Sequence, residues 1–482
     1  MRGGIIAAAG LGALLMAGTA DADTLREALV QTYNANPTIM AQRAAVRVND
    51  EGVAIARAQG RPQLSGTAGV NQNLTRTGGG NGRNLSATVD VGYPLFTGGR
   101  IRNSVQAANE RVAAGRALLR STEGDVFTDA VAVYMDVIRD RSIVTLNENQ
   151  VKVLETNLQA TRDQFEVGDL TRTDVAQSEA RLALARSTLA TAQGRLKGSE
   201  ENYRRVVGSL PGELAPPPPL PALPTSPDQA VDIALQNNSA LASIVAQARA
   251  AGFDVAVARA QRLPTISAYT NGTAANYLGT AGRQFGPGAA NQTLSTNVGV
   301  SANIPIYQGG LVGAQVRQAQ SFQTQLLEQG VEIERSVVAQ TRAAFSSYQA
   351  AQSAIESNRV AVSANTLALE GTRAEQTVGT RNVLDVLNAE QELLNSQVAL
   401  VTANRDAYVA GFQLLNAMGR AEAEDLNLDG GALYDPIANY NRVSRRASDW
   451  SDDPAPAPVS TRTVSGPSLV SPANSGVTPP SE

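Results

Sequence analysis

The chain of 482 residues contains neither cysteine nor histidine. Their absence excludes Cys-His nucleophile pairs, Ser-His-Asp triads and the usual zinc, haem and iron–sulfur sites. We therefore expect no enzyme, no metal and no cofactor. Aromatic residues make up only 4% of the chain, which suits long alanine-rich helices better than a thick globular core. The formal net charge of −4 and the presence of only two lysines argue against a nucleic-acid partner, because phosphates need a basic surface.

The first 22 residues have the form of an export signal peptide. Arg2 precedes the apolar run 5–16, and a small-residue cleavage site follows at 20–22, before Asp23. A membrane anchor is the alternative, but the run is shorter than the ~20 residues that a spanning helix needs. No later stretch is expected to cross a membrane as a helix. The mature chain is thus expected to leave the cytoplasm, and it has no cysteine for lipid attachment.

Alternation of apolar or small residues with polar ones predicts two β-hairpins, at about 63–94 and 264–305. The strand before Pro305 alternates almost strictly, from Leu294 to Ile304. The loop of the second hairpin is longer and is expected near 271–291. Each strand has about 10 residues, a length that suits a tilted crossing of a bilayer.

Each β-hairpin is followed by a long helical pattern. The absence of proline predicts a helical hairpin over 100–207 with its tip at 167–173, and a second over 311–418 with its tip at 378–384. At 1.5 Å per residue, the first arm of each hairpin would be roughly 100 Å long. These helices are too polar to cross lipid, so they are expected to project into water.

The chain therefore reads as a tandem duplication. The first structural repeat is 23–210 and the second is 228–420, and the Pro-rich linker 211–227 joins them. Segment 421–443 is expected to pack beside the middle of the helices, as a periplasmic equatorial segment. From 444 to 482 the chain is rich in Pro, Ser, Thr and Ala, which predicts a disordered tail.

The two tips carry the clearest repeat. Residues 376–386 (Gln-Thr-Val-Gly-Thr-Arg-Asn-Val-Leu-Asp-Val) repeat the pattern of 165–175 (Phe-Glu-Val-Gly-Asp-Leu-Thr-Arg-Thr-Asp-Val). Gly168 and Gly379 each follow a long helix, where the C′ position needs a positive φ that glycine adopts without a Cβ clash. Each stretch is therefore predicted to be helix, turn, helix.

The second helix of each tip has a predicted N-terminal cap. Thr171 and Asn382 suit the N-cap position, and Asp174 and Asp385 follow three residues later. There a carboxylate meets free backbone N–H groups and the positive end of the helix dipole.

Four bilayer-length strands cannot close a barrel, and open sheet edges are not tolerated in lipid. Several copies must therefore pool their strands, and three or four copies would give 12 or 16 strands with room for a lumen. The alternative is a non-pore periplasmic coiled-coil scaffold or stalk that carries two β-hairpins.

These features together resemble TolC-type outer membrane efflux proteins, over roughly 23–419. Besides the duplicated plan, the resemblance rests on Pro-[Leu/Ile]-[Phe/Tyr]-x-Gly-Gly at 94–99 and 305–310, and on Val-Gly-Thr-Arg followed by Asp-Val-Leu at the second tip. It implies an all-α long coiled-coil helical barrel joined to a membrane β-barrel. The assembly would be a homotrimer that shares a 12-stranded β-barrel, with four strands per chain.

The resemblance also implies a function. Such proteins are passive exit ducts in the Gram-negative outer membrane, for tripartite efflux or type I secretion, with a periplasmic helical extension that is gated at the hairpin tips. The implied partners are a periplasmic adaptor (membrane fusion) protein, an inner-membrane transporter and outer-membrane lipid.

Residue roles at the tips are implied in the same way. Asp385 matches an aspartate ring at the tunnel entrance, whereas Asn388 stands where the family has a second acidic ring. Arg381 matches a residue that links to the other hairpin, where Thr173 and Asp174 stand. The positions implied to contact the adaptor are Val167, Gly168, Asp169, Leu170, Val378, Gly379, Thr380 and Arg381.

A simpler interpretation of these residues stays open. Asp174 and Asp385 at N3 could simply stabilise their helices, by ~0.3 to 1 kcal/mol each. Arg381 could be an ordinary solvated arginine.

Overall fold

The structure, a computed structural model, describes residues 23–72, 74, 82–426, 428, 433–460 and 462–463. The expected signal peptide at 1–22 and the end of the expected tail, 464–482, lie outside the described residues. The elements in chain order are α1 (Leu25–Ala35), α2 (Pro37–Ala58), β1 (Gln63–Gln72), β2 (Arg83–Phe96), α3 (Arg100–Glu166), α4 (Arg172–Val207), α5 (Pro227–Asn237), α6 (Ser239–Ala260), β3 (Thr265–Asn276), α7 (Ala281–Phe285), β4 (Gln292–Asn303), α8 (Leu311–Thr377), α9 (Val383–Ala417) and α10 (Pro436–Val443).

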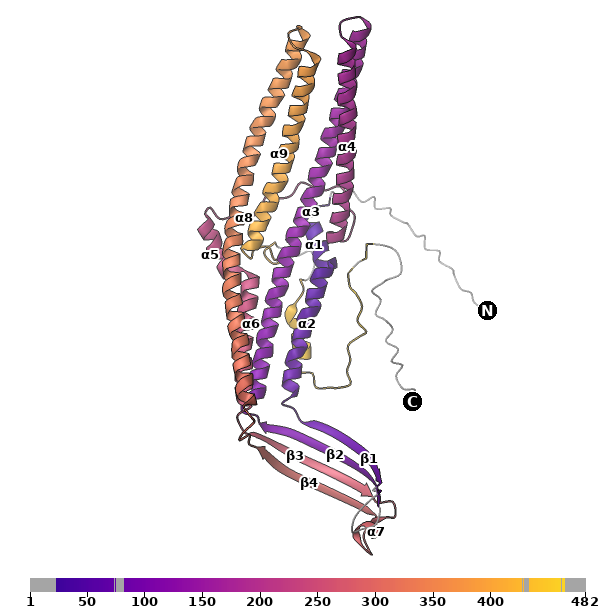
Figure 1. The fold of residues 1–482 in the computed structure, drawn as a ribbon, viewed down its shortest axis with the longest axis vertical. Coiled ribbons are helices and arrows are strands. Elements are labelled where there is room, and N and C mark those ends of the chain that lie inside the picture. The colour runs from indigo at the N-terminus through magenta and orange to yellow at the C-terminus, as the bar shows by residue number, and fades with distance from the viewer. Residues whose placement is uncertain are drawn as a thin grey trace, which may run out of the picture.

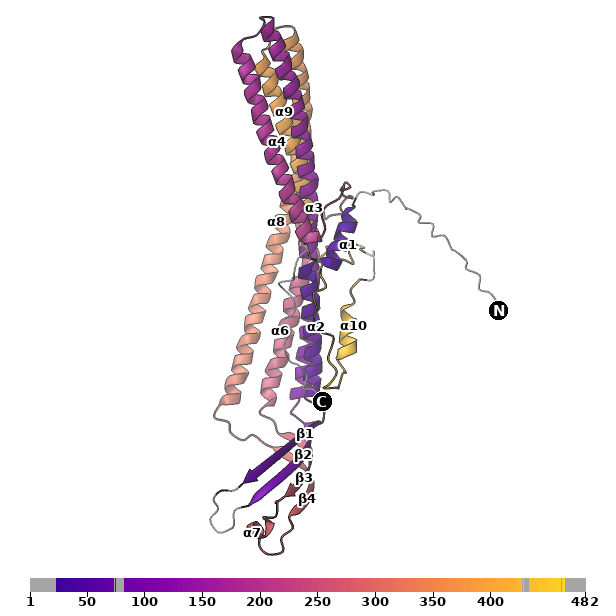
Figure 2. The same ribbon diagram turned by 90° about the vertical axis from the view of Figure 1, so that its right-hand side faces the viewer.

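The molecule is long and narrow, with the sheet at one end and the two helical tips at the other (Figure 1). Helices α3 and α8 have 67 residues each and run from the sheet to the tips. The shorter α4 and α9 complete the hairpins in the half of the molecule away from the sheet. Helices α2 and α6 lie beside α3 in the half nearer the sheet (Figure 2).

The duplication extends to backbone angles. The helix, helix, strand, strand, helix, helix order of the first half recurs in the second, with α7 and α10 as additions. Before α3, Gly98 and Gly99 have φ of 60° and 82°, and before α8, Gly309 and Gly310 have the same values. Glycine is needed at these positions because other residues rarely adopt positive φ. The repeated motif therefore turns the chain from strand into helix in the same way twice.

All four strands form one antiparallel sheet in the order β1-β2-β3-β4. Pairing of β2 with β3 joins the two halves, and β1 and β4 are its edges. Strand β3 extends to Asn276, farther than the loop expected from residue 271, because Asn276 still pairs with Leu85 and Gln292. The connection that follows contains the short helix α7.

The sheet has one apolar and one polar face. Cross-strand rows on the apolar face are Leu64–Val91–Thr270–Val298 and Ala68–Ala87–Ala274–Leu294, and rows on the polar face are Ser65–Asp90–Asn271–Asn297 and Thr67–Thr88–Thr273–Ser295. Hydrogen bonds of 3.1 Å connect the side chains of Asn271 and Asn297, and those of Thr88 and Thr273. Val298 and Leu294 are 86% and 80% exposed. The sheet thus presents both an apolar and a polar surface to its surroundings.

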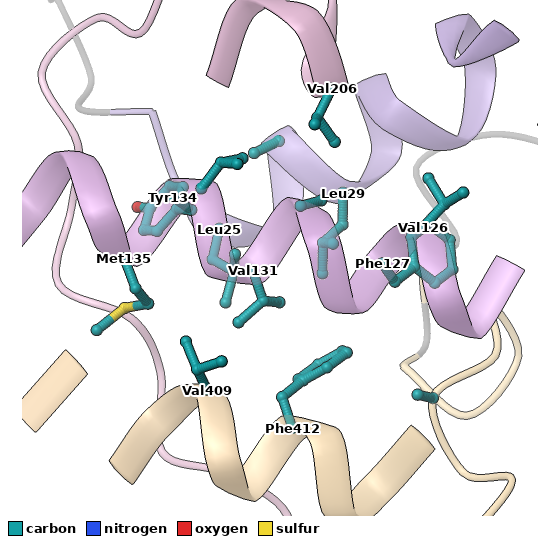
Figure 3. Close-up of a cluster of buried hydrophobic side chains, with 14 of the residues drawn as sticks. Leu25, Leu29, Val126, Phe127, Val131, Tyr134, Met135, Val206, Val409 and Phe412 are labelled. Carbon is teal, nitrogen blue, oxygen red and sulfur yellow. The ribbon is translucent and has the colours of Figure 1, made fainter. Parts of the chain in front are cut away.

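The main hydrophobic core lies midway along the helices, where α1, α3, α4 and α9 meet (Figure 3). Phe127 and Tyr134 are fully buried there. The Tyr134 hydroxyl is 2.6 Å from the carbonyl oxygen of Ala215 and 2.9 Å from that of Asp23. This contact ties the Pro-rich linker to the core, and Leu220 of the linker packs against the same cluster. The linker is therefore part of the packed structure.

The C-terminal region differs from its sequence-based description. Helix α10 packs against α2, and Ser444, at the start of the expected disordered tail, is only 3% exposed. Arg57 donates a 2.8 Å hydrogen bond to the Ser444 carbonyl. These contacts could not be predicted from the low-complexity sequence of the segment, because they are made with a helix almost 400 residues earlier in the chain.

Among the residues that the structure describes, one helix is long and apolar enough to span a membrane by length and composition, contrary to expectation. This helix, α6, is rich in alanine and valine, and 33% of its most apolar window is buried. In the structure it packs against α3 and α8, which cover part of its apolar surface.

Candidate functional site at the helical tips

Both tips have the same turn. At the first, Gly168 and Asp169 donate backbone hydrogen bonds to Phe165 and Gln164, and at the second, Gly379 and Thr380 donate to Gln376 and Glu375, at 3.0 to 3.1 Å. The φ angles of Gly168 and Gly379 are 87° and 78°, as the C′ position requires. The turns thus end helices α3 and α8 in the manner that the sequence predicted.

Capping boxes begin the second helix of each tip, as predicted. The Thr171 and Asn382 side chains accept hydrogen bonds from the N–H groups of Asp174 and Asp385, at 3.3 and 2.8 Å. The two carboxylates accept in return from the N–H groups of Thr171 and Asn382, at 2.9 and 3.3 Å. Hydrogen bonds from Thr171 also lower the pKa of Asp174. Both aspartates therefore have a structural role, whatever else they do.

Arg381 does not contact the first hairpin within the chain. Its Nε lies 2.9 Å from Oε2 of Glu375, on the same hairpin, and both side chains are about half exposed. Asp174 is bound to Thr171, as described above, and Thr173 is exposed at the tip. The expected link from Arg381 to Thr173 and Asp174 is therefore not made within one chain. The reason is local: Glu375 ends up beside Arg381 once the turn has formed.

A different residue links the hairpins. Arg181 on α4 donates a 2.8 Å hydrogen bond from Nη2 to Oδ1 of Asn388 on α9. Asn388 was singled out from the sequence only as a gap in an acidic ring. Its amide oxygen can accept from arginine without adding a negative charge. Sequence patterns did not point to Arg181 because the two residues lie 207 positions apart.

Glu390, two residues along α9, forms a second link. Its carboxylate accepts from Nδ2 of Asn157 on α3, at 3.0 and 3.1 Å, and from Arg373 on α8, at 2.9 Å. Glu390 is only 3% exposed, so a buried charge connects three helices from both hairpins. Nothing in the local sequence distinguished it from the many surface glutamates.

Apolar contacts surround these polar links. Leu387 of α9 is 3% exposed and packs in one cluster with Leu154 and Leu158 of α3 and Leu182 of α4. We call this contact, with Arg181, Asn388, Asn157 and Glu390, the inter-hairpin seam. The seam holds the two hairpins together below their tips.

The tips themselves are open to solvent. Val167 and Val378, at equivalent positions, are each 74% exposed. Of the eight positions implied to contact an adaptor, seven are exposed and only Leu170 is half-buried. Paired exposed valines on two hydrogen-bonded turns are available for contact with another protein.

The chain matches the family described as outer membrane efflux protein over residues 28–209 and 230–420. The chain belongs to this family. The match covers most of both structural repeats and omits the whole Pro-rich linker between them.

Two relatives and one solved structure are similar over most of the chain. The outer membrane efflux protein BepC of Brucella suis is 37% identical over 446 residues, which are 91% of this chain and 95% of that protein. The outer membrane protein TolC of Escherichia coli is 26% identical and covers 86% of each chain. The outer membrane channel CmeC of Campylobacter jejuni superposes with a TM-score of 0.73, over 87% of this chain and 89% of that one, at 15% identity.

Family membership places the protein in the outer membrane, with its helices extending into the periplasm. It acts as an exit duct. This decides against the scaffold without a pore, which the sequence alone had left open. The family is one of channel proteins, and no enzymatic family is indicated.

Proposed function

We propose that three copies of this chain form a passive duct, with a shared 12-stranded β-barrel in the outer membrane and a helical barrel in the periplasm. The observation that carries this proposal is the sheet, which combines an apolar face, a polar face and two open edges. In lipid the apolar face can meet the hydrocarbon and the polar face can line water.

The open edges call for other copies. The backbone groups at the outer sides of β1 and β4 would be left without partners in hydrocarbon, at several kcal/mol per group. Pairing of β1 from one copy with β4 from the next satisfies them, and three copies give 12 strands. The helices that continue from these strands would then surround a tunnel.

In this assembly the tips form the periplasmic gate. The inter-hairpin seam keeps the two hairpins of each copy together, and Asp385 faces the entrance, with Asn388 one turn behind it. A periplasmic adaptor docks on the exposed turns at 167–170 and 378–381, and an inner-membrane transporter supplies the energy. Opening is a shift between two arrangements of the tips, and adaptor and transporter favour the open one. Relatives are named for efflux and for protease secretion, so the same duct fits tripartite efflux and type I secretion.

Disulfide pairing across the β1–β4 edge tests this assembly, because the chain has no cysteine of its own. Ala68→Cys on β1 would be combined in turn with cysteine at Leu294, Val298 or Ala302 on β4. All four positions lie on the same face of the sheet. After oxidation in outer-membrane fractions, at least one pair should give covalent dimers and trimers and no larger species.

The single variant Ala68→Cys is the matched control and should give no trimer. If all three pairs gave monomers alone, the shared barrel would be contradicted. A covalent tetramer would indicate a 16-stranded barrel in place of the 12-stranded one. Conductance steps in planar bilayers would then test whether the assembly encloses a pore.

A further inference from the structure

The C-terminal segment returns to the sheet end of the molecule. Helix α10 lies along α2, with Nδ2 of Asn439 2.8 Å from Oδ2 of the buried Asp50 and with Val443 fully buried. The Tyr440 hydroxyl lies 3.1 Å from Oδ1 of Asn109 on α3. These contacts anchor the end of segment 421–443, just before the expected disordered tail, against α2 and α3.

Two arginines near the end of α2 hold the segment that follows. Arg57 binds the carbonyl of Ser444 at 2.8 Å, and Arg61 binds the carbonyls of Arg445 and Arg446, the former at 3.2 Å. Arg61 lies only two residues before the first residue of β1. The chain at 444–446 is therefore fixed at the junction of helix and sheet.

Residues 446–453 then form a closed turn. Asp453 pairs with Arg442 at 2.9 Å and with Arg446 at 3.0 Å, and Arg446 Nε also binds the Ser451 hydroxyl at 2.8 Å. The two guanidinium groups hold the pKa of Asp453 well below its usual range, so this carboxylate stays charged in any near-neutral solution. We call residues 446–453 the rim turn.

The rim turn presents Trp450 to solvent. Trp450 is the only tryptophan of the chain and is 96% exposed. Leaving so large an apolar ring in water is unfavourable, and a tryptophan on a turn closed by ion pairs has no route into the core. An exposed aromatic held in place in this way indicates a partner.

The position of the rim turn identifies that partner. Strands of 10 to 14 residues, tilted by about 45°, span roughly 25 to 30 Å, which matches the apolar band of an outer-membrane barrel. The start of β1 would then lie at the edge of the hydrocarbon, in the headgroup layer. Phe96 ends β2 at the same level, and Tyr307 follows β4 with 86% of its surface exposed. Aromatic rings are enriched at this depth because they combine an apolar body with a polar N–H or O–H group.

We propose that Trp450 inserts into the headgroup layer of the periplasmic leaflet and anchors the C-terminal segment to the membrane. The inference rests on the proposed placement of β1–β4 in lipid. The rim turn and its flank carry three arginines and three aspartates, at 442, 445, 446, 449, 452 and 453, so their charges balance. Insertion therefore depends on the indole ring and takes place equally in zwitterionic and anionic bilayers.

Fluorescence of the native protein tests this directly, because all tryptophan emission comes from one residue. The full-length assembly would be reconstituted into phosphatidylcholine vesicles with nitroxide-labelled lipids, with the nitroxide either near the headgroup or deep in the acyl chains. We expect emission shifted to shorter wavelength than in the urea-unfolded chain, strong quenching by the shallow label and weak quenching by the deep label. Adding phosphatidylglycerol should change neither result.

A second tryptophan position provides the matched control. In Trp450→Phe/Val459→Trp the single tryptophan is moved to an exposed site. Position 459 lies four residues before Thr463, whose carbonyl accepts a hydrogen bond from Arg204 near the C-terminal end of α4. Its emission should stay at long wavelength and be quenched by acrylamide in the water, and not by either lipid label. A Val298→Cys variant labelled with a dye reports separately whether β4 meets lipid.

The outcomes separate this inference from the proposed function. If the dye on β4 is quenched by lipid labels and Trp450 is not, the anchor is wrong while the barrel stands. Short-wavelength emission without lipid quenching would show that another protein surface covers Trp450, which also overturns the anchor. If neither probe is quenched, the placement of the sheet in lipid fails as well.

Discussion

Nη2 of Arg181 and Oδ1 of Asn388 lie 2.8 Å apart, and this hydrogen bond joins α4 of one hairpin to α9 of the other. Leu387 and Leu182, each one residue from a member of this pair, belong to one buried apolar cluster. Both links act between the two hairpins of one chain, so the gate can be disturbed by a change that leaves each hairpin intact.

Arg181→Ala should loosen the seam and raise the resting conductance of channels in planar bilayers. The hydrogen bond is exposed to solvent, so its loss is expected to cost about 1 kcal/mol, which is about a fivefold change in the ratio of closed to open tips. Arg381→Ala is the matched control because it removes the same charge near the tip, where the partner Glu375 is on its own hairpin. Equal leakage from both variants would show that charge, and not the inter-hairpin bond, controls the gate.

Glu390→Ala should weaken the seam more than Arg181→Ala does. Glu390 is buried, and its removal leaves the Asn157 amide without its acceptor. Arg373 is half exposed and can turn toward water, so we expect a loss of about 1 to 3 kcal/mol, less than for a fully buried pair. Limited proteolysis of the tips and thermal unfolding would measure the effect.

Glu390→Gln keeps an amide oxygen as acceptor for Asn157 and Arg373 and should lose clearly less stability than Glu390→Ala. Identical behaviour of the two variants would mean that the negative charge itself is essential. If neither variant changed the stability of the tips, Glu390 would not contribute to the seam.

Much of the architecture follows from local patterns. The sequence predicted strands at 63–72 and near 294–304, and the structure has them at Gln63–Gln72 and Gln292–Asn303. Alternation in strands, glycines at positive φ and the capping boxes are local requirements, so they can be read from a few neighbouring residues. The tips were predictable for the same reason.

Contacts between the hairpins were not predictable in this way. Which residues of α4 and α9 meet depends on how two hairpins of about 100 Å twist around each other, and a small rotation would bring a different side chain opposite Asn388. Within the chain Arg381 pairs with Glu375 of its own hairpin, and its link to the other hairpin stays a prediction. The attachment of residues 444–446 to the end of α2 was missed because their partners, Arg57 and Arg61, lie almost 400 residues earlier.

Asp385→Asn should change the ion selectivity of the channel without disturbing the helix start. The amide oxygen of asparagine can still accept from the Asn382 N–H, which the Asp385 carboxylate does at 3.3 Å, but the negative charge is gone. If Asp385 faces the entrance, single channels should become less cation-selective, by an amount that falls at high salt because the charge is screened.

Asp174→Asn is the control for that experiment, because Asp174 holds the same capping position in the first hairpin. It should leave selectivity closer to that of the parent. Unchanged selectivity in Asp385→Asn would leave Asp385 with its capping role alone.

Glu123 should make the stability of the central core depend on pH. It lies on α3, only 7% exposed, and faces Arg43, Arg120, Glu422 and Glu424. Burial raises its pKa from the ordinary 4.5 to about 7, an effect that Arg43 opposes. The folded state therefore binds this proton more tightly than the unfolded state does. The resulting stabilisation is fully present below about pH 4.5 and is lost as the pH rises through about 7.

Glu123→Gln places a neutral side chain of similar size at this site and should remove that part of the pH dependence. Its stability relative to the parent should therefore grow between about pH 5 and pH 8, by roughly 3 kcal/mol at most. Urea unfolding followed by circular dichroism at several pH values measures the difference. Glu424→Gln, at an exposed position nearby, should follow the parent closely. Parallel pH profiles for the parent and Glu123→Gln would mean that Glu123 titrates normally in the folded protein, with water reaching its carboxylate.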